Sequence, residues 1–285
     1  MAAGIIARVW PAVAKINLFL HITGRRADGY HLLQTVFQFL DIADELRFEV
    51  TDKGPIRRVS GPAGVLANAD LTVRAAQLLR DHAGCRMGAE IHLDKRLPVG
   101  GGVGGGSSDA ATTLVALNAL WGCGLDPGQL QELGASLGAD VPVFINGHAA
   151  WADGVGERLH ILELSQPWYL LIKPDVEIST AEIFAAPELT RNCPPITISD
   201  FLAGGGTNVC EPVVTHRYPQ VSRALEWLRQ YGDARLTGTG SCVFAAFERE
   251  AYAQRALSQL PQQWRGYVAR GLNRSPLTTL SQAAV

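Results

Sequence analysis

The sequence lacks long hydrophobic runs and an excess of positive charge, and both absences narrow its function. No apolar stretch approaches the roughly 20 residues of a membrane-spanning helix. The N-terminal MAAGIIARVWPAVAK has no apolar core followed by a small-residue cleavage site. The formal net charge is −2 and the pI is about 6.4, so no basic surface for nucleic acid is expected. We therefore expect a cytoplasmic protein that binds neither nucleic acid nor a membrane and holds any anionic ligand with a local motif.

Cysteine and lysine are also scarce. The cysteines are odd in number, with no C-x-x-C pair and no zinc-ligand spacing, which argues against a disulfide framework and indicates no metal site. We expect reduced, partly buried thiols at Cys85, Cys123, Cys193, Cys210 and Cys242. The basic residues are almost all arginine, which makes each lysine more informative. The lysines are Lys15, Lys53, Lys95 and Lys173.

The composition is that of a folded globular protein. Of 285 residues, 47% are hydrophobic and 18% are charged, which suffices for one large or two modest domains with a real core. The character of the chain changes near Leu164-Ser165-Gln166-Pro167, where we place a domain boundary. The prediction is an N-terminal domain of residues 1–164 and a C-terminal domain of residues 165–285.

The most distinctive stretch is Pro98 to Ala111, PVGGGVGGGSSDAA, in which six of the seven positions from Gly100 to Gly106 are glycine. Glycine takes positive φ without steric cost and leaves no Cβ between the backbone and a ligand. Ser107-Ser108-Asp109 offers N-cap chemistry for a helix over residues 110–121, which ends at the Gly122-Cys123-Gly124 turn. Bare amides at the positive end of a helix dipole favour phosphate, so we predict a nucleoside triphosphate as ligand.

Other glycine motifs fit this loop less well. The G-x-G-x-x-G dinucleotide pattern is present, but the preceding IHLDKRLP is polar at alternate positions, and Asp126 precedes Pro127 at an apparent helix start. A Walker loop needs a Lys after the glycines, where this chain has Gly106 or Ser107. A flexible glycine hinge is the remaining alternative, and the clean helix start behind the loop argues against it.

Three polar residues in apolar surroundings are candidates for chemistry. In the predicted strand VAKINLFLHIT, alternation projects Lys15 and Asn17 from the same face. Spacing alone favours a solvent-facing polar surface, and a cation and an amide lining a cleft are the alternative. Asp140 in GADVPVF either caps the helix that Val141-Pro142 begins, or is a buried carboxylate with a partner or a task. The two roles of Asp140 can coexist.

The turn Asp28-Gly29 presents Tyr30 and His31 before an apolar segment. Such a pair can stack on a planar base and hydrogen-bond its edge, or equally cap the edge of a core. Elsewhere in the first half we expect hairpin structure over residues 44–64 and 151–162, and helices over residues 70–84 and 126–138.

The second half reads as a small α+β sandwich. It contains a buried strand in WYLLIKP, a helix start at Ser179, and the amphipathic helix VSRALEWLRQYG. RLTGTGSCVFAAF is a glycine turn joined to an apolar strand. We expect the last helix over residues 250–260 and a closing edge strand over residues 264–272.

PVGGGVGGGSSDAA together with LTGTGSCVFA resembles the GHMP small-molecule kinases, which bind ATP without a Walker loop. Within that superfamily, AKINLFLHITGRRADGYHLLQTVFQFLD, LGADVPVF, GHAAWADGVGE and the N-x-S-P-L of Asn273 to Leu277 resemble the 4-diphosphocytidyl-2-C-methyl-D-erythritol kinases of the non-mevalonate isoprenoid pathway. The resemblance covers nearly the whole chain. It implies an α+β, two-domain GHMP kinase fold, with an N-terminal domain like the second domain of ribosomal protein S5, a ferredoxin-like C-terminal domain and the site between them.

The resemblance also implies roles for the matching positions. Lys15 takes the place of the family's catalytic lysine, and Asp140 that of the general base. The ATP phosphates would be held by Pro98, Val99, Gly100, Gly101, Gly102, Val103, Gly104, Gly105, Gly106, Ser107 and Ser108, with Gly238 and Gly240 closing over them. The substrate contacts would be Asn17, Tyr30, His31, Phe37, Thr180 and Phe184, of which Tyr30 and His31 hold the cytosine.

This chain departs from the family pattern at two places. Where members often read D-N-L, it has Ala69-Asp70-Leu71, so an Asn expected beside the adenine is absent. Val103 replaces the usual Leu in the glycine loop.

The reaction implied is transfer of a phosphoryl group from ATP, with Mg²⁺, to the 2-hydroxyl of 4-diphosphocytidyl-2-C-methyl-D-erythritol. Asp140 would accept the hydroxyl proton, and Lys15 would keep Asp140 ionised and neutralise developing charge. One alternative is another kinase of the superfamily, acting on homoserine, mevalonate or a sugar, but Tyr30, His31 and Phe184 suit a flat base. The other is a nucleotide-binding regulator, which would need neither Lys15 nor Asp140. No obligate protein partner is expected.

Overall fold

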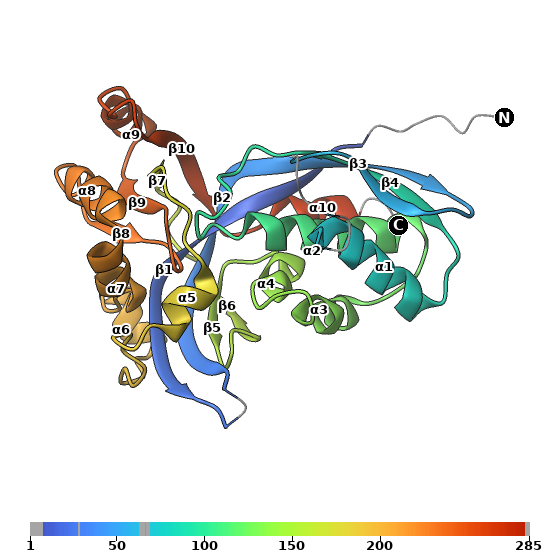
Figure 1. Ribbon diagram of the computed structural model, residues 1–285, viewed down its shortest axis with the longest axis horizontal. Helices are drawn as coiled ribbons and strands as arrows, with labels where there is room; N and C mark the ends of the chain where they lie inside the picture. Colours follow the sequence, from blue (N-terminus) through green and yellow to red (C-terminus); the bar gives the residue numbers. More distant parts are fainter. Residues whose placement is uncertain (1–7, 28, 63–65, 67–68, 283–285) are drawn as a thin grey trace.

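Two long antiparallel strands run through the whole molecule (Figure 1). They are β1 (Trp10–Arg25) and β2 (His31–Thr51), and they pair along almost their full length with three register shifts. The computed structural model describes residues 8–27, 29–62, 66 and 69–282. Of the turn predicted between the two strands, Asp28 therefore lies outside the described residues.

Within the described residues, ten strands form one sheet. Besides β1 and β2 they are β3 (Ile56–Ser60), β4 (Gly88–Asp94), β5 (Ala150–Asp153), β6 (Arg158–Ile161), β7 (Trp168–Lys173), β8 (Ala234–Leu236), β9 (Val243–Phe247) and β10 (Arg265–Leu272). The order is β3-β4-β2-β10-β7-β9-β8, with β1 and the β5–β6 hairpin attached to β2. The hairpin predicted over residues 151–162 is confirmed. The one predicted over residues 44–64 is wrong, because β4 lies between β2 and β3, and β3 pairs with β4 in parallel.

A layer of helices covers one face of the N-terminal part of the sheet (Figure 1). It contains α1 (Leu71–Ala83), α2 (Gly105–Leu120), α3 (Pro127–Ala135), α4 (Val141–Asn146) and α10 (Pro276–Gln282). The helices predicted over residues 70–84 and 126–138 are confirmed. Asp70 accepts hydrogen bonds from the first amides of α1, and Asp126 forms a capping box with Gln129 at the start of α3.

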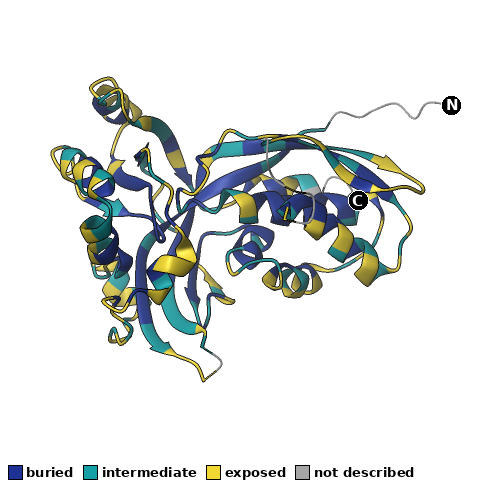
Figure 2. Cartoon of the chain, viewed as in Figure 1, coloured by how far each residue is buried: buried dark blue, intermediate teal, exposed yellow. Residues whose placement is uncertain are grey.

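The helix after the glycine loop starts earlier than the N-cap pattern predicts. The cap residue of α2 is Gly104, in the left-handed conformation with φ +71°, so the prediction of a cap at Ser107-Ser108-Asp109 is wrong. Ser108 and Asp109 lie inside the helix and are buried, as is every residue from 108 to 117. α2 therefore runs through the core rather than over its surface (Figure 2). The predicted end at the Gly122 turn is confirmed.

The C-terminal half combines β7, β8 and β9 with further helices. These are α5 (Thr180–Ala185), α6 (Ile198–Leu202), α7 (Cys210–Arg217), α8 (Pro219–Leu228) and α9 (Glu250–Leu257). The helix start at Ser179 and the helix over VSRALEWLRQYG are confirmed. The helix α7, which follows an irregular connection, was not predicted from the sequence. The described part of the chain has no helix both long and apolar enough to cross a membrane.

Two predictions for the end of the chain are wrong. β10 is not an edge strand, because it pairs with β7 over residues 265–270 and with β2 at Gly271 and Leu272. Gly271 allows this close packing, since a Cβ there would lie 3.0 Å from the Tyr169 ring and 3.1 Å from the Gln38 amide. The helix predicted over residues 250–260 is confirmed, but it is not the last one, because α10 follows it and packs against β1 and α2 of the other half. The division into residues 1–164 and 165–285 stays a prediction.

Two glycine turns from opposite halves of the chain bond to each other. The amides of Ser241 and Cys242 donate to the carbonyl oxygens of Gly100, at 3.2 Å, and Gly101, at 3.1 Å. Gly102 has a φ of +74°, and a Cβ there would lie 2.3 Å from the Thr237 carbonyl oxygen. We call this contact between residues 100–102 and 237–242 the glycine clasp. It fixes the glycine loop to the C-terminal half.

Beside the glycine loop, Lys95 bridges two buried carboxylates. Its Nζ lies 2.5 Å from Asp44 Oδ2 and 2.6 Å from Asp109 Oδ2. Asp44 Oδ1 also accepts the amides of Arg96, at 2.6 Å, and Leu97, at 2.7 Å. Burial raises the pKa of Asp109 to about 7; the Lys95 ammonium lowers it and the Asp44 carboxylate raises it. The cluster joins β2, the entrance to the loop and α2.

We expect Gly102→Ala to destabilise the protein more than Gly100→Ala. Both residues have positive φ, +74° and +64°, so both substitutions strain the backbone. A Cβ at position 100 has its nearest neighbour at an ordinary 3.6 Å, whereas one at position 102 meets backbone at 2.3 Å. The additional loss should be about 1–3 kcal/mol in the free energy of unfolding, measured in urea. Equal losses of stability in the two variants would show that the glycine clasp tolerates a side chain at position 102.

Asp109→Asn tests the cluster at Lys95 through the pH dependence of stability. The Asp109 carboxyl has a pKa of about 7 in the folded protein, against an ordinary value of 3.8. Its stabilising contribution is therefore fully present below about pH 4 and is lost as the pH rises through about 7. Between about pH 5 and pH 8 the wild type should lose at least about 1 kcal/mol relative to the Asn variant. Thermal unfolding of both proteins across this range measures the difference, and parallel curves would contradict the raised pKa.

Candidate active site

A cleft of about 590 Å³ opens beside the glycine loop. Strands β1 and β2, the glycine loop with the start of α2, the turn before α4, the start of α5 and the Gly238 turn all contribute to its walls. The predicted site residues that line it are Lys15, Asn17, Phe37, residues 98–107, Asp140, Thr180, Phe184 and Gly238. The predicted site residues outside its lining are Tyr30, His31, Ser108 and Gly240. The roles assigned to all these residues stay predictions.

Lys15 lines the cleft with only 3% of its surface exposed. Its Nζ donates to Asn17 Oδ1 at 2.6 Å and to the Gly102 carbonyl oxygen at 3.1 Å, and lies 3.2 Å from Asp140 Oδ2. A buried ammonium needs such partners because an unpaired one costs several kcal/mol, an order-of-magnitude figure. Asn17 is also buried, at 4%. The solvent-facing surface that spacing alone favours is therefore not formed.

Two threonines that the sequence analysis missed hold Asn17. The side-chain Nδ2 of Asn17 donates to Thr35 Oγ1 at 2.8 Å, and the backbone N–H of Asn17 donates to Thr237 Oγ1 at 3.0 Å. Thr35 lines the cleft two residues before Phe37 on β2, so the period-2 face that carries Phe37 could have identified it. Thr237 stands next to Gly238 in the glycine clasp, and only the tertiary contact reveals it.

Asp140 occupies the cap position of α4, but its side chain makes no capping hydrogen bond. The carboxylate instead pairs with Lys15, and its side chain is 34% exposed. Asp140 is therefore the cap residue of α4 by its backbone position, but its side chain does not cap the helix. Of the two partners, Lys15 is enclosed and Asp140 is open to the cleft, so a hydroxyl group entering the cleft can reach the carboxylate.

The glycine loop presents backbone amides to the cleft. The amides of Gly105, Gly106 and Ser107 belong to the first turn of α2, where amides have no acceptor within the helix. α2 has 16 residues, so the positive end of its dipole adds to these donors. A Cβ at Gly104 would lie 2.8 Å from the Phe144 ring, so only glycine fits where the loop turns into the helix. This arrangement suits a polyphosphate.

Beyond the loop the cleft continues along residues for which the sequence analysis made no assignment. They are Leu20, Leu33, Thr35, Pro62, Ala69, Asp70, Leu71, Thr72, Leu93, Lys95, Asp109, Ala139, Val155, Gly156 and Thr239. Leu71 lies beside the start of α2, since a Cβ at Gly106 would be 3.3 Å from Leu71 Cδ1. Asp70, which stands where an Asn was expected, accepts the first amides of α1 through Oδ1 and pairs with Arg58 through Oδ2. Its carboxylate is thus engaged by the protein itself.

The part of the cleft wall that α5 forms is aromatic. Phe184 lines it, and the His31 ring lies with its centroid 5.2 Å from that of Phe184. Burial, Arg191 and Arg25 lower the pKa of His31. Tyr30 is 66% exposed, and Thr180 Oγ1 lies 3.0 Å from Thr239 Oγ1 at the edge of the glycine clasp. Gly240 packs against Leu236 instead of facing the cleft.

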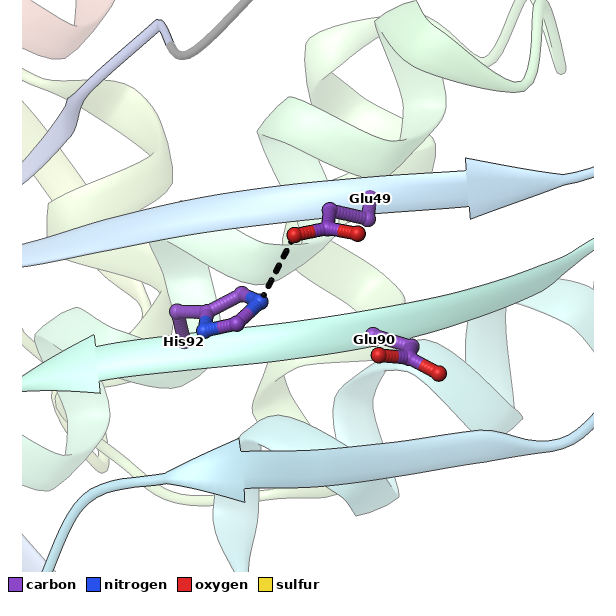
Figure 3. Close-up of side chains that lie close together, drawn as sticks. All are labelled: Glu49, Glu90 and His92. Atoms are coloured by element: carbon purple, nitrogen blue, oxygen red, sulfur yellow. Dashed lines mark hydrogen bonds and ion pairs between the residues drawn. The ribbon is translucent and has the colours of Figure 1, made fainter. Parts of the chain in front are cut away.

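A group of metal-type ligands lies away from the cleft, on β2 and β4 (Figure 3). His92 Nε2 is 3.1 Å from Glu49 Oε1, and Glu90 pairs with Arg57. Each of these side chains already has a protein partner, so the group supports no metal assignment. All five cysteines are free thiols, with Cys210 and Cys242 buried.

Comparison with known proteins agrees with this geometry. Residues 70–148 match the GHMP kinases N terminal domain, and residues 197–266 match the GHMP kinases C terminal domain. A 4-diphosphocytidyl-2-C-methyl-D-erythritol kinase of Nitrosococcus oceani is 59% identical over 269 residues, which cover 94% of this chain and 96% of the relative. The enzyme of the same name from Halorhodospira halophila is 56% identical over 280 residues, 97% of each chain.

A solved structure gives the same result. The crystal structure of 4-(cytidine 5'-diphospho)-2C-methyl-D-erythritol kinase matches with a TM-score of 0.80 at 34% identity, and the match covers 93% of this chain and 99% of the other. The predicted α+β GHMP kinase fold is confirmed. The chain therefore belongs to the 4-diphosphocytidyl-2-C-methyl-D-erythritol kinase family of the GHMP kinases, and it is a kinase.

Proposed function

We propose that this kinase transfers the γ-phosphoryl group of ATP to the 2-hydroxyl of 4-diphosphocytidyl-2-C-methyl-D-erythritol, a step of the non-mevalonate route to isoprenoid precursors. The observation that carries the proposal is the Lys15–Asp140 pair, 3.2 Å apart, in the same cleft as the amides at the start of α2. The names of relatives that match nearly the whole chain support the choice of acceptor. We further propose that the enzyme works in the cytoplasm, where free thiols persist.

Each part of the cleft wall has a role in this proposal. The α2 amides bind the β- and γ-phosphates, and the part of the cleft beside Leu71 and Leu93 takes the nucleoside. Asp140 accepts the proton of the acceptor hydroxyl, while Lys15 stabilises the carboxylate and the charge that develops on the transferred group. Phe184 stacks on the cytosine. The protein positions the reactants, and the loose transition state asks for little else.

The donor set of the cleft fits Mg²⁺ held mainly by phosphate oxygens. Of the cleft-lining carboxylates in the described residues, Asp70 is bound to Arg58 and Asp109 to Lys95. Asp140 pairs with Lys15 and serves as the base, so the Ser107 hydroxyl is the protein oxygen that remains, and phosphate oxygens would supply most of the ligands. When bound, Mg²⁺ would neutralise phosphate charge.

ADP release with purified protein tests the proposal. The acceptors are 4-diphosphocytidyl-2-C-methyl-D-erythritol, mevalonate and homoserine, each with Mg-ATP. We expect turnover with the cytidyl acceptor alone, and ³¹P NMR of the product to place the new phosphate on the 2-oxygen. Turnover with mevalonate or homoserine instead would overturn the acceptor, and ATP binding without turnover would support a regulator.

Asp140→Asn should lower kcat by about 10²- to 10⁴-fold, because the variant cannot accept the hydroxyl proton. Its KM for ATP should stay within about threefold, since the proposal assigns the phosphates to the α2 amides and not to Asp140. Lys15→Met should lose kcat to a similar extent. The matched control is Asp126→Asn, which changes the exposed cap of the neighbouring α3 to another good cap and should leave kcat intact. Near wild-type turnover in Asp140→Asn would remove the base from the mechanism.

Phe184→Ala should raise the KM for the cytidyl acceptor by about 10-fold, as expected for loss of one base-stacking contact. The KM for ATP should not change, because Phe184 belongs to α5 and not to the glycine loop or the start of α2. Phe201→Ala is the control, since its ring packs on Phe19, 5.4 Å away, outside the cleft. A KM for the cytidyl acceptor that is unchanged in Phe184→Ala would exclude this ring from acceptor binding.

A further inference from the structure

Arg191 makes an unusual set of contacts next to the aromatic part of the cleft. Its guanidinium donates to three backbone carbonyl oxygens, those of Phe184 at 2.9 Å, Ala186 at 2.7 Å and Leu189 at 2.9 Å. Its Nε donates to His31 Nε2 at 3.2 Å. One side chain from the connection after α5 thus holds both the backbone that carries Phe184 and the imidazole at the start of β2.

The contact with Arg191 determines where His31 carries its proton. A guanidinium has only donors and does not lose its charge in proteins, so His31 Nε2 must accept. The imidazole that accepts at Nε2 is the neutral form with its proton on Nδ1. The charged groups around the ring favour the same form, because Arg191 on one side and Arg25 on the paired strand β1 both disfavour an imidazolium.

We propose that Arg191 is a positioning residue that fixes His31 as a neutral Nδ1–H imidazole and holds it against Phe184. His31 Nδ1 is then a hydrogen-bond donor that Arg191 does not use, and we expect it to serve an acceptor on the edge of a base that stacks on Phe184. This inference rests on the proposed function, because it makes Arg191 a determinant of cytidyl binding. Cytosine presents a ring nitrogen and a carbonyl oxygen as such acceptors, whereas the ring nitrogen of uracil at the same position carries a proton.

The three carbonyl contacts of Arg191 support a positioning role. A flat guanidinium can satisfy several acceptors in one plane, whereas a lysine ammonium at the end of a flexible chain cannot reach all of them together. Arg191 is half-buried, so these bonds are partly shielded from water. Removing the guanidinium would therefore free both the His31 ring and the segment that carries Phe184.

The first test leaves Arg191 in place. The ¹⁵N shifts of the His31 imidazole in the ligand-free enzyme, assigned by their loss in His31→Asn, should show the Nδ1–H form at neutral pH. The imidazole should titrate below the ordinary value of about 6.5. An Nε2–H form, or an imidazolium at pH 7, would overturn the inference.

The second test removes the guanidinium. In Arg191→Met, the His31 titration should move up toward its ordinary value and the two neutral forms should mix. The KM for the cytidyl acceptor should rise about 10-fold, with kcat and the KM for ATP within about twofold. Arg191→Lys keeps the charge without the planar fork and should lie between wild type and Arg191→Met. Competition by CDP over UDP should weaken in the same order.

Arg217→Met is the matched control. Arg217 bonds Glu188 in the same connection after α5, through Nε at 2.6 Å and Nη2 at 2.9 Å, and it contacts Glu182 of α5. It therefore braces the same segment without touching His31, and Arg217→Met should leave the His31 spectrum and the cytidyl KM unchanged. Equal effects of the two Met variants would reduce Arg191 to a structural brace and overturn the inference.

The outcomes separate this inference from the proposed function. A wild type that does not turn over the cytidyl acceptor contradicts the proposed function, and with it the cytidyl part of the inference. An active wild type with an unchanged His31 spectrum in Arg191→Met contradicts the inference alone. If Arg191→Met does not fold, the wild-type spectrum and Arg191→Lys still decide the question.

Discussion

The glycine clasp is the contact on which the rest of the site depends. Backbone from residues 100–102 and from residues 237–242 approaches closely enough to hydrogen-bond only because Gly102 has no side chain to meet the Thr237 carbonyl. The same Gly102 carbonyl oxygen accepts from Lys15 Nζ and from Thr237 Oγ1. The position of the buried ammonium is thus coupled to the joining of the two halves, and a shift in the clasp would move Lys15 relative to Asp140.

Near the glycine clasp, two largely buried lysine ammonium groups are each paired with oxygen atoms of the protein. Lys15 is compensated by an amide oxygen, a carbonyl oxygen and a carboxylate, and Lys95 by two carboxylates. Both lysines reach the start of α2, since a Cβ at Gly104 would lie 3.1 Å from Lys15 Cε and one at Gly105 would lie 3.0 Å from Lys95 Nζ. Desolvated charges of this kind contribute little net stability, but each fixes the direction of the backbone beside it. The loop amides are held in place by the charges around them.

Local sequence signals predicted the parts of the fold that depend on neighbouring residues. Asp70, Asp126 and Ser179 mark helix starts through caps that act within a few residues. The glycine loop leading into α2 was equally visible, although its real cap is Gly104, because a left-handed glycine leaves no side-chain signature. The pairing of strands that lie far apart in the sequence was not predicted correctly. The place of β3 beside β4, and of β10 between β2 and β7, depends on contacts far apart in the chain.

The residues of the candidate site also fall into those that local motifs reveal and those that only tertiary contacts reveal. Lys15, Asp140 and the glycine loop were found by motif, but Thr35, Thr237 and Arg191 were not, since their roles arise only when separate segments meet. The resemblance to the kinase family supplied what spacing could not, by placing Lys15 in a cleft where alternation alone favoured solvent. The cytosine-binding roles of Tyr30 and His31 stay predictions, with His31 adjoining the cleft through Phe184 rather than lining it.

The central position of β10 has a consequence for how the protein is made. The strand β10 is among the last segments to leave the ribosome. Until it is synthesised, β2 at Leu40 and the edge of β7 that pairs with β10 have no partner strand. Open strand edges are templates for pairing with other chains. A nascent or truncated polypeptide without residues 265–272 would therefore expose such an edge on each half.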